Sequence, residues 1–245
     1  MRDHLTLASR LKYFLWRTGV LGSGPIVFQH KDGPRLLVRP DPAGDLITAY
    51  EVFVSEIYRP PWKIPADSIR YTVDIGSNIG LSAAYLGRAF PQSKLALFEP
   101  HPVHVALLKS QLAANGLTNR AEIFPVAVGA AAGSFHLTDE GTSSTLSHQG
   151  GSGTIPVTVI DWLDWAQGRS IDYLKVDAEG AEYPLFFDLR MEGIKARYVV
   201  VEWHRTEQYP NGKELMLKRL QALGYETEPG VQTSDLCGLI WGRRR

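Results

Sequence analysis

The sequence predicts an α/β protein in which a mainly parallel, doubly wound sheet is covered by helices on both faces. From Tyr71 onward, short apolar runs alternate with segments of helix-compatible composition. A turn with two glycines follows the first run, and the first two runs end in the acids Asp74 and Glu99. Alternating strands and helices form parallel sheets, whose ligands bind beyond the carboxyl ends of the strands.

The first part of the chain is predicted to be an extension that precedes this sheet. Residues 3–18 form an amphipathic helix, because apolar residues recur at helical spacing, among them Leu5, Leu11 and Phe14. We expect this stripe to pack on the domain or on a partner subunit rather than on a membrane surface. A hairpin over 25–29 and 35–39 and a helix over 46–58 follow. The extension is placed at residues 1–65 and the main domain at residues 66–245.

The main domain is read as a series of strands joined by helices. The strands are expected at residues 71–75, 94–98, 121–128, 171–176, 197–202 and 237–242. The helices are expected at residues 79–90, 102–115, 181–192 and 211–223. Between the third and fourth strands lies an additional β-hairpin, residues 134–137 and 154–159. Its Gly/Ser-rich tip, residues 141–153, is either a lid over the site or a polar loop with no fixed role.

The composition excludes several classes of function. Lysine and arginine balance aspartate and glutamate at 26 each, so no net field attracts nucleic acid. The single cysteine, Cys237, excludes an internal disulfide, and its apolar setting predicts a packed core thiol. No apolar stretch is long enough to span a bilayer, so stable membrane insertion is not expected. The predicted location is the cytoplasm.

The glycine turn and Glu99 together predict an adenosine site. Glycines let backbone N–H groups approach a ligand, and an acid at a strand end accepts the hydroxyls of a ribose. An acid about 20 residues after a glycine turn also occurs in dinucleotide folds, but two residues favour S-adenosylmethionine over NAD. Asp74 would repel a pyrophosphate and attract an ammonium group, and Asn78 stands where a dinucleotide loop needs glycine. The predicted cofactor contacts are Asp74, Gly76, Ser77, Asn78, Gly80, Glu99, Pro100, Val126, Ala127 and Asp177.

Five segments carry a resemblance to a known family. They are VDIGSNIG at 73–80, FEPHP at 98–102, PVAVG at 125–129, VIDWL at 159–163 and LKVDAEGAE at 174–182. In this order they resemble the FkbM family of S-adenosylmethionine-dependent methyltransferases, and the last segment is the most specific. The resemblance implies a Rossmann-like, seven-stranded class I methyltransferase sheet whose last strand is antiparallel. It also implies O-methylation of a hydroxyl, often on a sugar or a polyketide-type product.

Polar side chains at two further strand ends are the predicted catalytic groups. Asp177 and Glu179 follow the strand at 171–176, and Glu202 and His204 end the next strand, so all four are expected at one sheet edge. Glu182 is interpreted as a charge that the helix dipole favours. His148, in the loop at 141–153, is a second candidate base.

The pKa values of the groups decide how these residues can act. A sugar hydroxyl ionises near the pKa of water, about 15.7, whereas histidine ionises near 6.5. No side chain can therefore form the alkoxide in advance. Either His204 takes the proton while the methyl group is transferred, or a metal lowers the pKa of the hydroxyl. Carboxylates without thiolates suit Mg²⁺, for which Asp177 and Glu202 are the predicted ligands.

The predicted function is transfer of a methyl group from S-adenosylmethionine to a hydroxyl of a sugar, oligosaccharide or glycosylated metabolite. Two alternatives stay open: a non-catalytic subunit that binds the cofactor, and an NAD-dependent oxidoreductase, for which no Tyr-x-x-x-Lys pattern is found. The extension at residues 1–65 is expected to shape the acceptor site or to form a homodimer contact.

Overall fold

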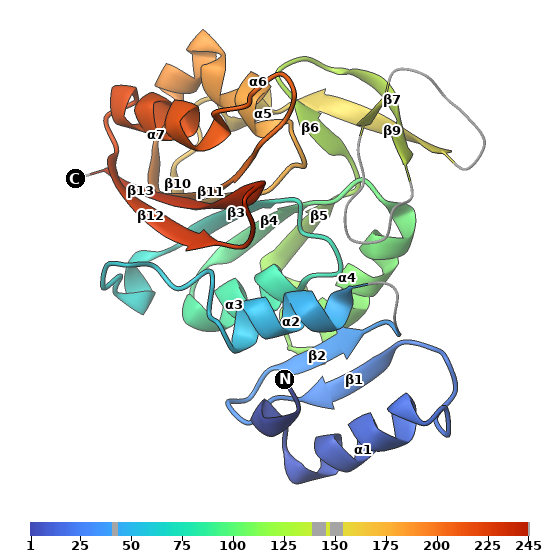
Figure 1. The fold of residues 1–245 in the computed structure, drawn as a ribbon. Helices are drawn as coiled ribbons and strands as arrows, with labels where there is room; N and C mark the ends of the chain where they lie inside the picture. The colour runs from blue at the N-terminus through green and yellow to red at the C-terminus, as the bar shows by residue number, and fades with distance from the viewer. Residues whose placement is uncertain (41–43, 139–145, 148–153, 245) are drawn as a thin grey trace.

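A computed structural model of the chain describes residues 1–40, 44–138, 146–147 and 154–244. Its centre is a seven-stranded sheet (Figure 1). In spatial order the strands are β12 (Glu226–Gln232), β13 (Cys237–Arg243), β11 (Ala196–His204), β10 (Ile171–Val176), β3 (Tyr71–Ile75), β4 (Lys94–Phe98) and β5 (Ala121–Phe124). The strands from β11 to β5 are parallel, and β13 is antiparallel to both of its neighbours. The predicted sheet, with its antiparallel last strand, is confirmed.

Helices cover both faces of this sheet (Figure 1). One face carries α2 (Asp45–Phe53), α3 (Leu81–Ala89) and α4 (Pro102–Ala114), and the other carries α5 (Trp162–Ala166), α6 (Glu182–Phe187) and α7 (Gly212–Ala222). Each face of the sheet has its own hydrophobic core, and successive residues of β11 point alternately into one and the other. Val199 and Val201 pack in the core with α6 and α7, whereas Val200 packs in the core with α3. This alternation explains why the central strands read as continuous apolar runs.

The N-terminal segment forms a further layer beyond α2 and α4 (Figure 1). It contains α1 (Leu7–Arg17) and the antiparallel hairpin of β1 (Ile26–Gln29) and β2 (Arg35–Val38). The edge of β2 is tied to α4, because the N–H of Leu37 donates to Gln111 Oε1 at 2.7 Å and the N–H of Arg35 donates to Asn115 Oδ1 at 2.9 Å. Buried residues of this segment belong to the same hydrophobic cluster as Tyr173 and Val200 of the sheet.

A second, four-stranded sheet stands beside the main one. It contains β6 (Ala127–Gly129), β9 (Thr154–Asp161), β7 (Gly133–Thr138) and β8 (Leu146–Ser147) in that order. The single strand predicted at 121–128 is therefore wrong. It divides at Pro125, which has no N–H for a ladder, so that β5 belongs to the main sheet and β6 to the second. The remainder of the tip at 141–153 lies outside the described residues.

Several element boundaries also differ from the prediction. The helix expected at 3–18 begins only at Leu7, because Thr6 caps it, and a 3₁₀ turn, η1 (Arg2–His4), precedes it. The helix expected at 46–58 ends at Phe53, and the one expected at 181–192 divides into α6 and η4 (Leu189–Gly193). The short α5 and the edge strand β12, which contains Pro229 and Gly230, were not predicted. Two further 3₁₀ turns are η2 (Ala66–Ser68) and η3 (Thr118–Arg120).

Among the described residues, no helix combines the length and the apolar character needed to cross a membrane.

Candidate functional site

A cavity of about 360 Å³ lies at the carboxyl ends of the central strands. Its walls come from the turn after β3, the ends of β4, β10 and β11, the start of β6, and α2. Of the predicted site residues, those that line it are Gly76, Ser77, Asn78, Glu99, Pro100, Val126, Ala127, Asp177, Glu179 and Glu202. Most of the predicted site therefore gathers around one cavity, which is the arrangement expected for a doubly wound sheet.

The glycine turn is shaped by close contacts between backbones. Gly76 has φ +76°, and a Cβ there would overlap the carbonyl oxygen of Asp177. Gly80 has φ +89°, and a Cβ there would collide with Leu108 of α4. Gly80 does not line the cavity, and its lack of a side chain allows α3 to pack against α4. Its predicted role as a cofactor contact is not tested. Asn78, in contrast, lines the cavity and itself has φ +47°.

Asp74 does not face the cavity, which corrects its predicted role as the partner of a ligand ammonium group. Its carboxylate is fully buried, 3.1 Å from Lys175 Nζ, and accepts a hydrogen bond from the Ser82 hydroxyl at 2.7 Å. Asp74 and Lys175 are paired across β3 and β10. The ammonium group that Asp74 binds is therefore that of Lys175.

Lys175 is a site residue that the sequence reasoning missed. It is buried, lines the cavity, donates to the carbonyl of Gly76 at 3.1 Å and lies 3.4 Å from Asp177 Oδ2. Burial alone would lower the pKa of Lys175, but the negative charges of Asp74 and Asp177 raise that pKa well above its usual value. The residue thus carries a permanent positive charge between two carboxylates. A lone lysine inside an apolar strand was the available signal.

The carboxylate of Glu99 is held in a defined orientation at the cavity wall. Oε2 accepts the N–H of Asn78 at 2.8 Å, Oε1 accepts the N–H of His101 at 2.9 Å, and His104 Nδ1 lies 3.4 Å from Oε1. Each carboxylate oxygen can accept a further hydrogen bond. Glu99 therefore connects the glycine turn to the end of β4 and presents acceptor atoms beside the turn.

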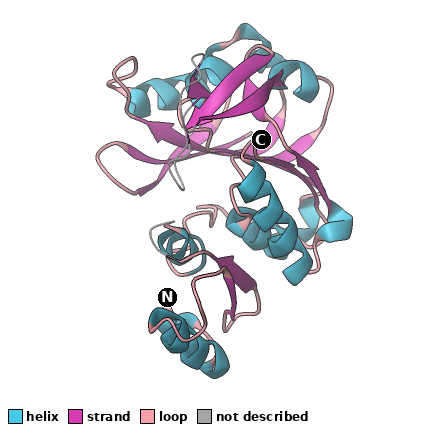
Figure 2. Ribbon diagram, turned by 90° about the vertical axis from the view of Figure 1, so that its right-hand side faces the viewer, coloured by secondary structure: helices cyan, strands magenta, loops and turns pink. Residues whose placement is uncertain are grey.

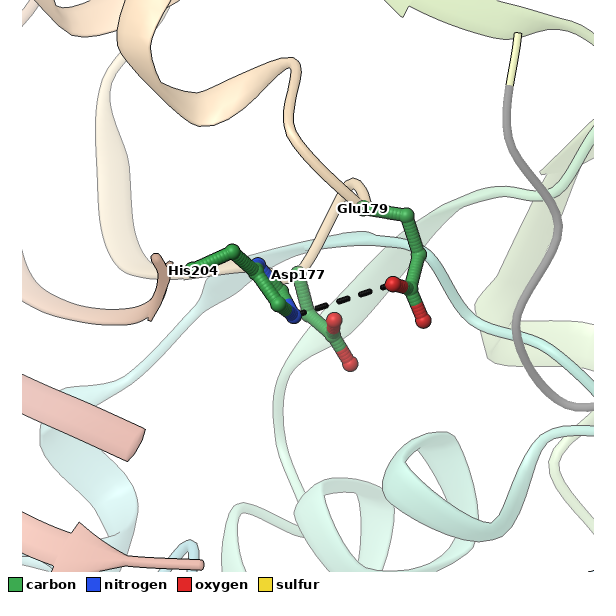
Figure 3. A group of neighbouring side chains, drawn as sticks. All are labelled: Asp177, Glu179 and His204. Atoms are coloured by element: carbon green, nitrogen blue, oxygen red, sulfur yellow. Dashed lines mark ion pairs between the residues drawn. The ribbon is translucent and has the colours of Figure 1, made fainter. Parts of the chain in front are cut away.

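Asp177, Glu179 and His204 come together at the edge formed by β10 and β11 (Figure 3). His204 Nε2 lies 3.7 Å from Glu179 Oε2, and Nδ1 lies 3.3 Å from Glu182 Oε1. Asp177 and Glu179 line the cavity, whereas His204 does not. Asp177 and Glu179 are therefore the members of this group that a ligand in the cavity would meet.

Glu182 supports this edge from within the protein. It is fully buried in the first turn of α6, where the predicted interaction with the helix dipole is possible. Its carboxylate also forms two hydrogen bonds with the backbone. Its two oxygens accept the N–H groups of Ala178 at 2.7 Å and Gly180 at 2.8 Å. These bonds hold a turn in which Glu179 has φ +49°, an uncommon backbone conformation for a residue with a side chain.

The pKa values of two side chains at this edge are strongly perturbed. Burial, together with the charge of Asp177, raises the pKa of Glu202 to about 8. Burial by itself lowers the pKa of His204, but Glu182 and the other carboxylates outweigh it and raise that pKa to about 10. His204 therefore holds a proton at neutral pH. A protonated imidazole cannot accept a proton, which argues against the predicted role of His204 as the general base; that role is not tested.

The predicted pair of metal ligands, Asp177 and Glu202, stays a prediction. In the described part of the chain, the one group able to hold a metal consists of Asp177, Glu179 and His204, whose ligand atoms lie within 4.8 Å of one another. Glu202 is not a member. Cations already lie beside both carboxylates, Lys175 next to Asp177 and His204 next to Glu179. His148 lies outside the described residues, so its predicted role is not tested.

Further residues of the cavity lining come from parts of the chain to which the sequence analysis assigned no role at the site. Thr48 and Glu51 of α2 line the cavity, and burial raises the pKa of Glu51. Thr233 and Ser234, between β12 and β13, and Cys237, the first residue of β13, line it as well. Cys237 is half-buried beside the hydroxyls of Thr233 and Ser234, so the predicted core thiol is wrong.

Four features define a nucleotide-binding α/β protein of the methyltransferase type. They are the strand order, the glycine turn, the fixed acid after β4 and the cavity beyond the strand ends. Residues 74–227 match the model of the methyltransferase FkbM domain. The chain belongs to the FkbM methyltransferase family.

The individual relatives share only short segments or low sequence identity with this chain. The methyltransferase sdnD of Sordaria araneosa is 37% identical over 68 residues, which cover 28% of this chain and 26% of that protein. Among solved structures, cofactor-bound Rv0187 from MTB has a TM-score of 0.49 at 16% identity, with 84% of this chain and 91% of that chain covered. The methyltransferase FkbM from Methylobacillus flagellatus KT has a TM-score of 0.49 at 13% identity, with 84% and 56% covered.

Proposed function

We propose that the protein transfers the methyl group of S-adenosylmethionine to a hydroxyl of a sugar, an oligosaccharide or a glycosylated metabolite. One observation carries this proposal: the fixed carboxylate of Glu99 and the carboxylates of Asp177 and Glu202 line the same cavity. The cofactor would span between them. Its adenosine would lie against Glu99, Pro100, Val126 and Ala127, and its amino-acid end against Gly76, Ser77 and Asn78.

The charges around the cavity support this orientation. A sulfonium and an ammonium group are cationic, and Asp177 and Glu179 supply carboxylates near the end of the cofactor that would carry them. Asp177 takes the role first predicted for Asp74, because its side chain is exposed to the cavity and that of Asp74 is not. Lys175 limits the negative charge at this point and orients Asp177 through their 3.4 Å contact.

Glu202 is the side chain that we assign as the general base. As the methyl group moves from sulfur to the acceptor oxygen, the C–S bond breaks, the O–C bond forms and the hydroxyl proton passes to Glu202. S-adenosylhomocysteine and the methyl ether are the products. A base works best when its pKa lies near the operating pH, which the raised pKa of Glu202 satisfies. Glu182 and the protonated imidazole of His204 would hold Glu179 in place.

Polar residues in the rest of the cavity lining support a hydroxyl-rich acceptor. These residues are Thr48, Glu51, Thr233 and Ser234. Their side chains carry hydroxyl and carboxyl groups, which can exchange hydrogen bonds with sugar hydroxyls. Since α2 belongs to the segment at residues 1–65, that segment would contribute directly to acceptor binding.

Calorimetry with S-adenosylhomocysteine and with NADH tests the class of cofactor. We expect binding of the former and none of the latter, and the reverse result would assign the protein to the oxidoreductases.

Incubation with methyl-labelled cofactor and a panel of saccharides then tests turnover. Cofactor binding without transfer to any acceptor would support the non-catalytic alternative. A parallel reaction with EDTA, followed by added Mg²⁺, tests the metal: loss and rescue of activity would move the main role from Glu202 to a cation.

A further inference from the structure

The backbone N–H groups of the glycine turn are already used within the protein. Each N–H from residue 76 to residue 80 donates a hydrogen bond of 2.8 to 3.1 Å. In chain order, the acceptors are the carbonyl of Phe98 twice, Glu99 Oε2, Asn78 Oδ1 and the carbonyl of Ser77. A carboxylate of a ligand binds through donors. From residue 76 to residue 80, the turn therefore has no uncommitted N–H with which to bind one.

The ammonium group of Lys175 is engaged in the same way. It has three protons, and four oxygens of the protein lie within 3.4 Å of Nζ. They belong to Asp74, Ile75, Gly76 and Asp177. The positive charge of Lys175 still attracts an anion, but the hydrogen bond to that anion has to come from another group.

Tyr58 brings a hydroxyl to this end of the cavity. It comes from the N-terminal segment, which lies below the main sheet in Figures 1 and 2. The residue lines the cavity, is only 5% exposed, and holds its ring over Lys175, with Nζ 5.4 Å from the ring centroid. Its backbone is fixed in a turn after α2, in which the N–H of Arg59 donates to the carbonyl of Glu56 at 2.8 Å.

The hydroxyl of Tyr58 is not used by the protein itself. Among the residues that the structure describes, none forms a hydrogen bond with it, and its oxygen is not enclosed by the surrounding protein. A buried tyrosine hydroxyl usually has a hydrogen-bond partner. This hydroxyl is therefore free to bind a ligand in the cavity that it lines.

The phenol of Tyr58 keeps its proton. Burial raises the pKa of Tyr58 well above its ordinary value, and the charges of Asp177 and Glu202 act in the same direction. Together they outweigh Lys175, which by itself lowers that pKa. At neutral pH the group is thus a hydrogen-bond donor and not a base.

We propose that Tyr58 binds the carboxylate at the amino-acid end of S-adenosylmethionine, with its hydroxyl donating to one carboxylate oxygen. The inference rests on the proposed function, because it takes this cofactor as the ligand. The ammonium group of the same end would face Asp177, and the carboxylate would lie on the side of Lys175 and Tyr58. The N-terminal segment would then contribute to cofactor binding as well as to acceptor binding.

Calorimetry with S-adenosylhomocysteine, and with its analogue in which hydrogen replaces the carboxylate, tests the proposal. Tyr58→Phe removes the hydroxyl and keeps the ring over Lys175. Its affinity for S-adenosylhomocysteine should fall by about tenfold to a hundredfold, the effect of losing a hydrogen bond to a charged group. Its affinity for the analogue should equal that of the wild type, because the analogue has no carboxylate to lose.

Tyr173→Phe is the matched control. Tyr173 belongs to the same hydrophobic cluster as Tyr58, and its hydroxyl also has no hydrogen-bond partner among the described residues, but it does not line the cavity. This variant should bind both ligands like the wild type. An unchanged melting temperature of each variant checks that the protein is folded.

Two results with the Tyr58 variant would overturn the inference. One is an unchanged affinity for S-adenosylhomocysteine, and a raised KM for the acceptor in the same variant would assign the hydroxyl to the acceptor instead. The other is an equal loss of affinity for both ligands, which would show that the hydroxyl does not act through the carboxylate. Failure of the wild type to bind S-adenosylhomocysteine is a distinct result, because it overturns the proposed function itself.

Discussion

Glu202 occupies the position where the proposed chemistry can be tested most directly. Glu202→Gln keeps the shape of the side chain but removes its capacity to accept a proton. Turnover should fall by roughly 10² to 10⁴, the usual share of general base catalysis, while calorimetry should give an unchanged affinity for S-adenosylhomocysteine. The control is Glu228→Gln on the exposed part of β12. Near-wild-type turnover of the Glu202 variant would remove Glu202 as the base, and loss of turnover in His148→Ala would then place the base in the loop.

The same residue predicts the pH dependence of the reaction. Burial, helped by the charge of Asp177, raises the pKa of Glu202 to about 8, so below that pH the side chain is mostly protonated and cannot act as a base. We expect kcat/KM to rise with pH, approaching tenfold per unit, and to level off above about 8. Steady-state rates between neutral and mildly alkaline pH measure this. A profile that is flat, or that falls with pH, contradicts the assignment.

Glu182 should matter for both stability and turnover, although it does not line the cavity. In Glu182→Gln, one oxygen is replaced by an amide nitrogen that cannot accept the N–H of Ala178 or Gly180. An unsatisfied buried donor costs about 1–3 kcal/mol, which a urea titration would detect. Because Glu179 loses its support, kcat should fall more than the affinity for the cofactor. Equal stability of variant and wild type would show that the turn does not depend on this carboxylate.

At the scale of elements, the turn after β3 and the loop after β10 depend on each other. A methyl group at Gly76 would overlap the Asp177 carbonyl, and φ +76° is unfavourable for alanine. Gly76→Ala should therefore push the two loops apart and abolish binding of S-adenosylhomocysteine in calorimetry. Gly193→Ala is the matched control, since no atom lies within 4 Å of its added methyl group. Normal binding by the Gly76 variant would mean that the two loops can separate without affecting the site.

For the whole molecule, the N-terminal segment should be needed for stability. Residues 1–40 bury Leu5, Trp16 and Phe28 in the cluster that also contains Tyr173 and Val200 of the sheet. Each buried side chain of this size contributes about 1.5–3 kcal/mol, and a domain is stable by only about 5–15 kcal/mol. Deleting residues 1–40 should thus lower the urea midpoint substantially or prevent folding. A truncated chain as stable as the full one would show that the segment is an independent cover.

How far the sequence predicts the site differs between residues for a physical reason. The sequence predicted correctly that Glu99 lies at the cavity, because that placement depends on position along the chain, at a strand end after a glycine turn. Asp74 satisfied the same rule, yet its carboxylate forms a buried ion pair with Lys175 and does not face the cavity. Lys175 lies opposite Asp74 only because β3 pairs with β10. Such pairing joins residues about a hundred positions apart and leaves no local pattern.

The sequence by itself determined the alternation of strands and helices, the glycine turn and the acids at the strand ends, because these follow from local periodicity and backbone geometry. Tertiary structure alone decided the protonation of His204 and the raised pKa of Glu202, since both arise from burial among carboxylates of different segments. It also decided which face of α1 is exposed: Leu11 and Phe14 lie on the surface, contrary to their predicted packing on the domain. A helical stripe specifies a face of the helix, whereas the neighbour that covers that face, or leaves it bare, is set by the packing of the whole chain.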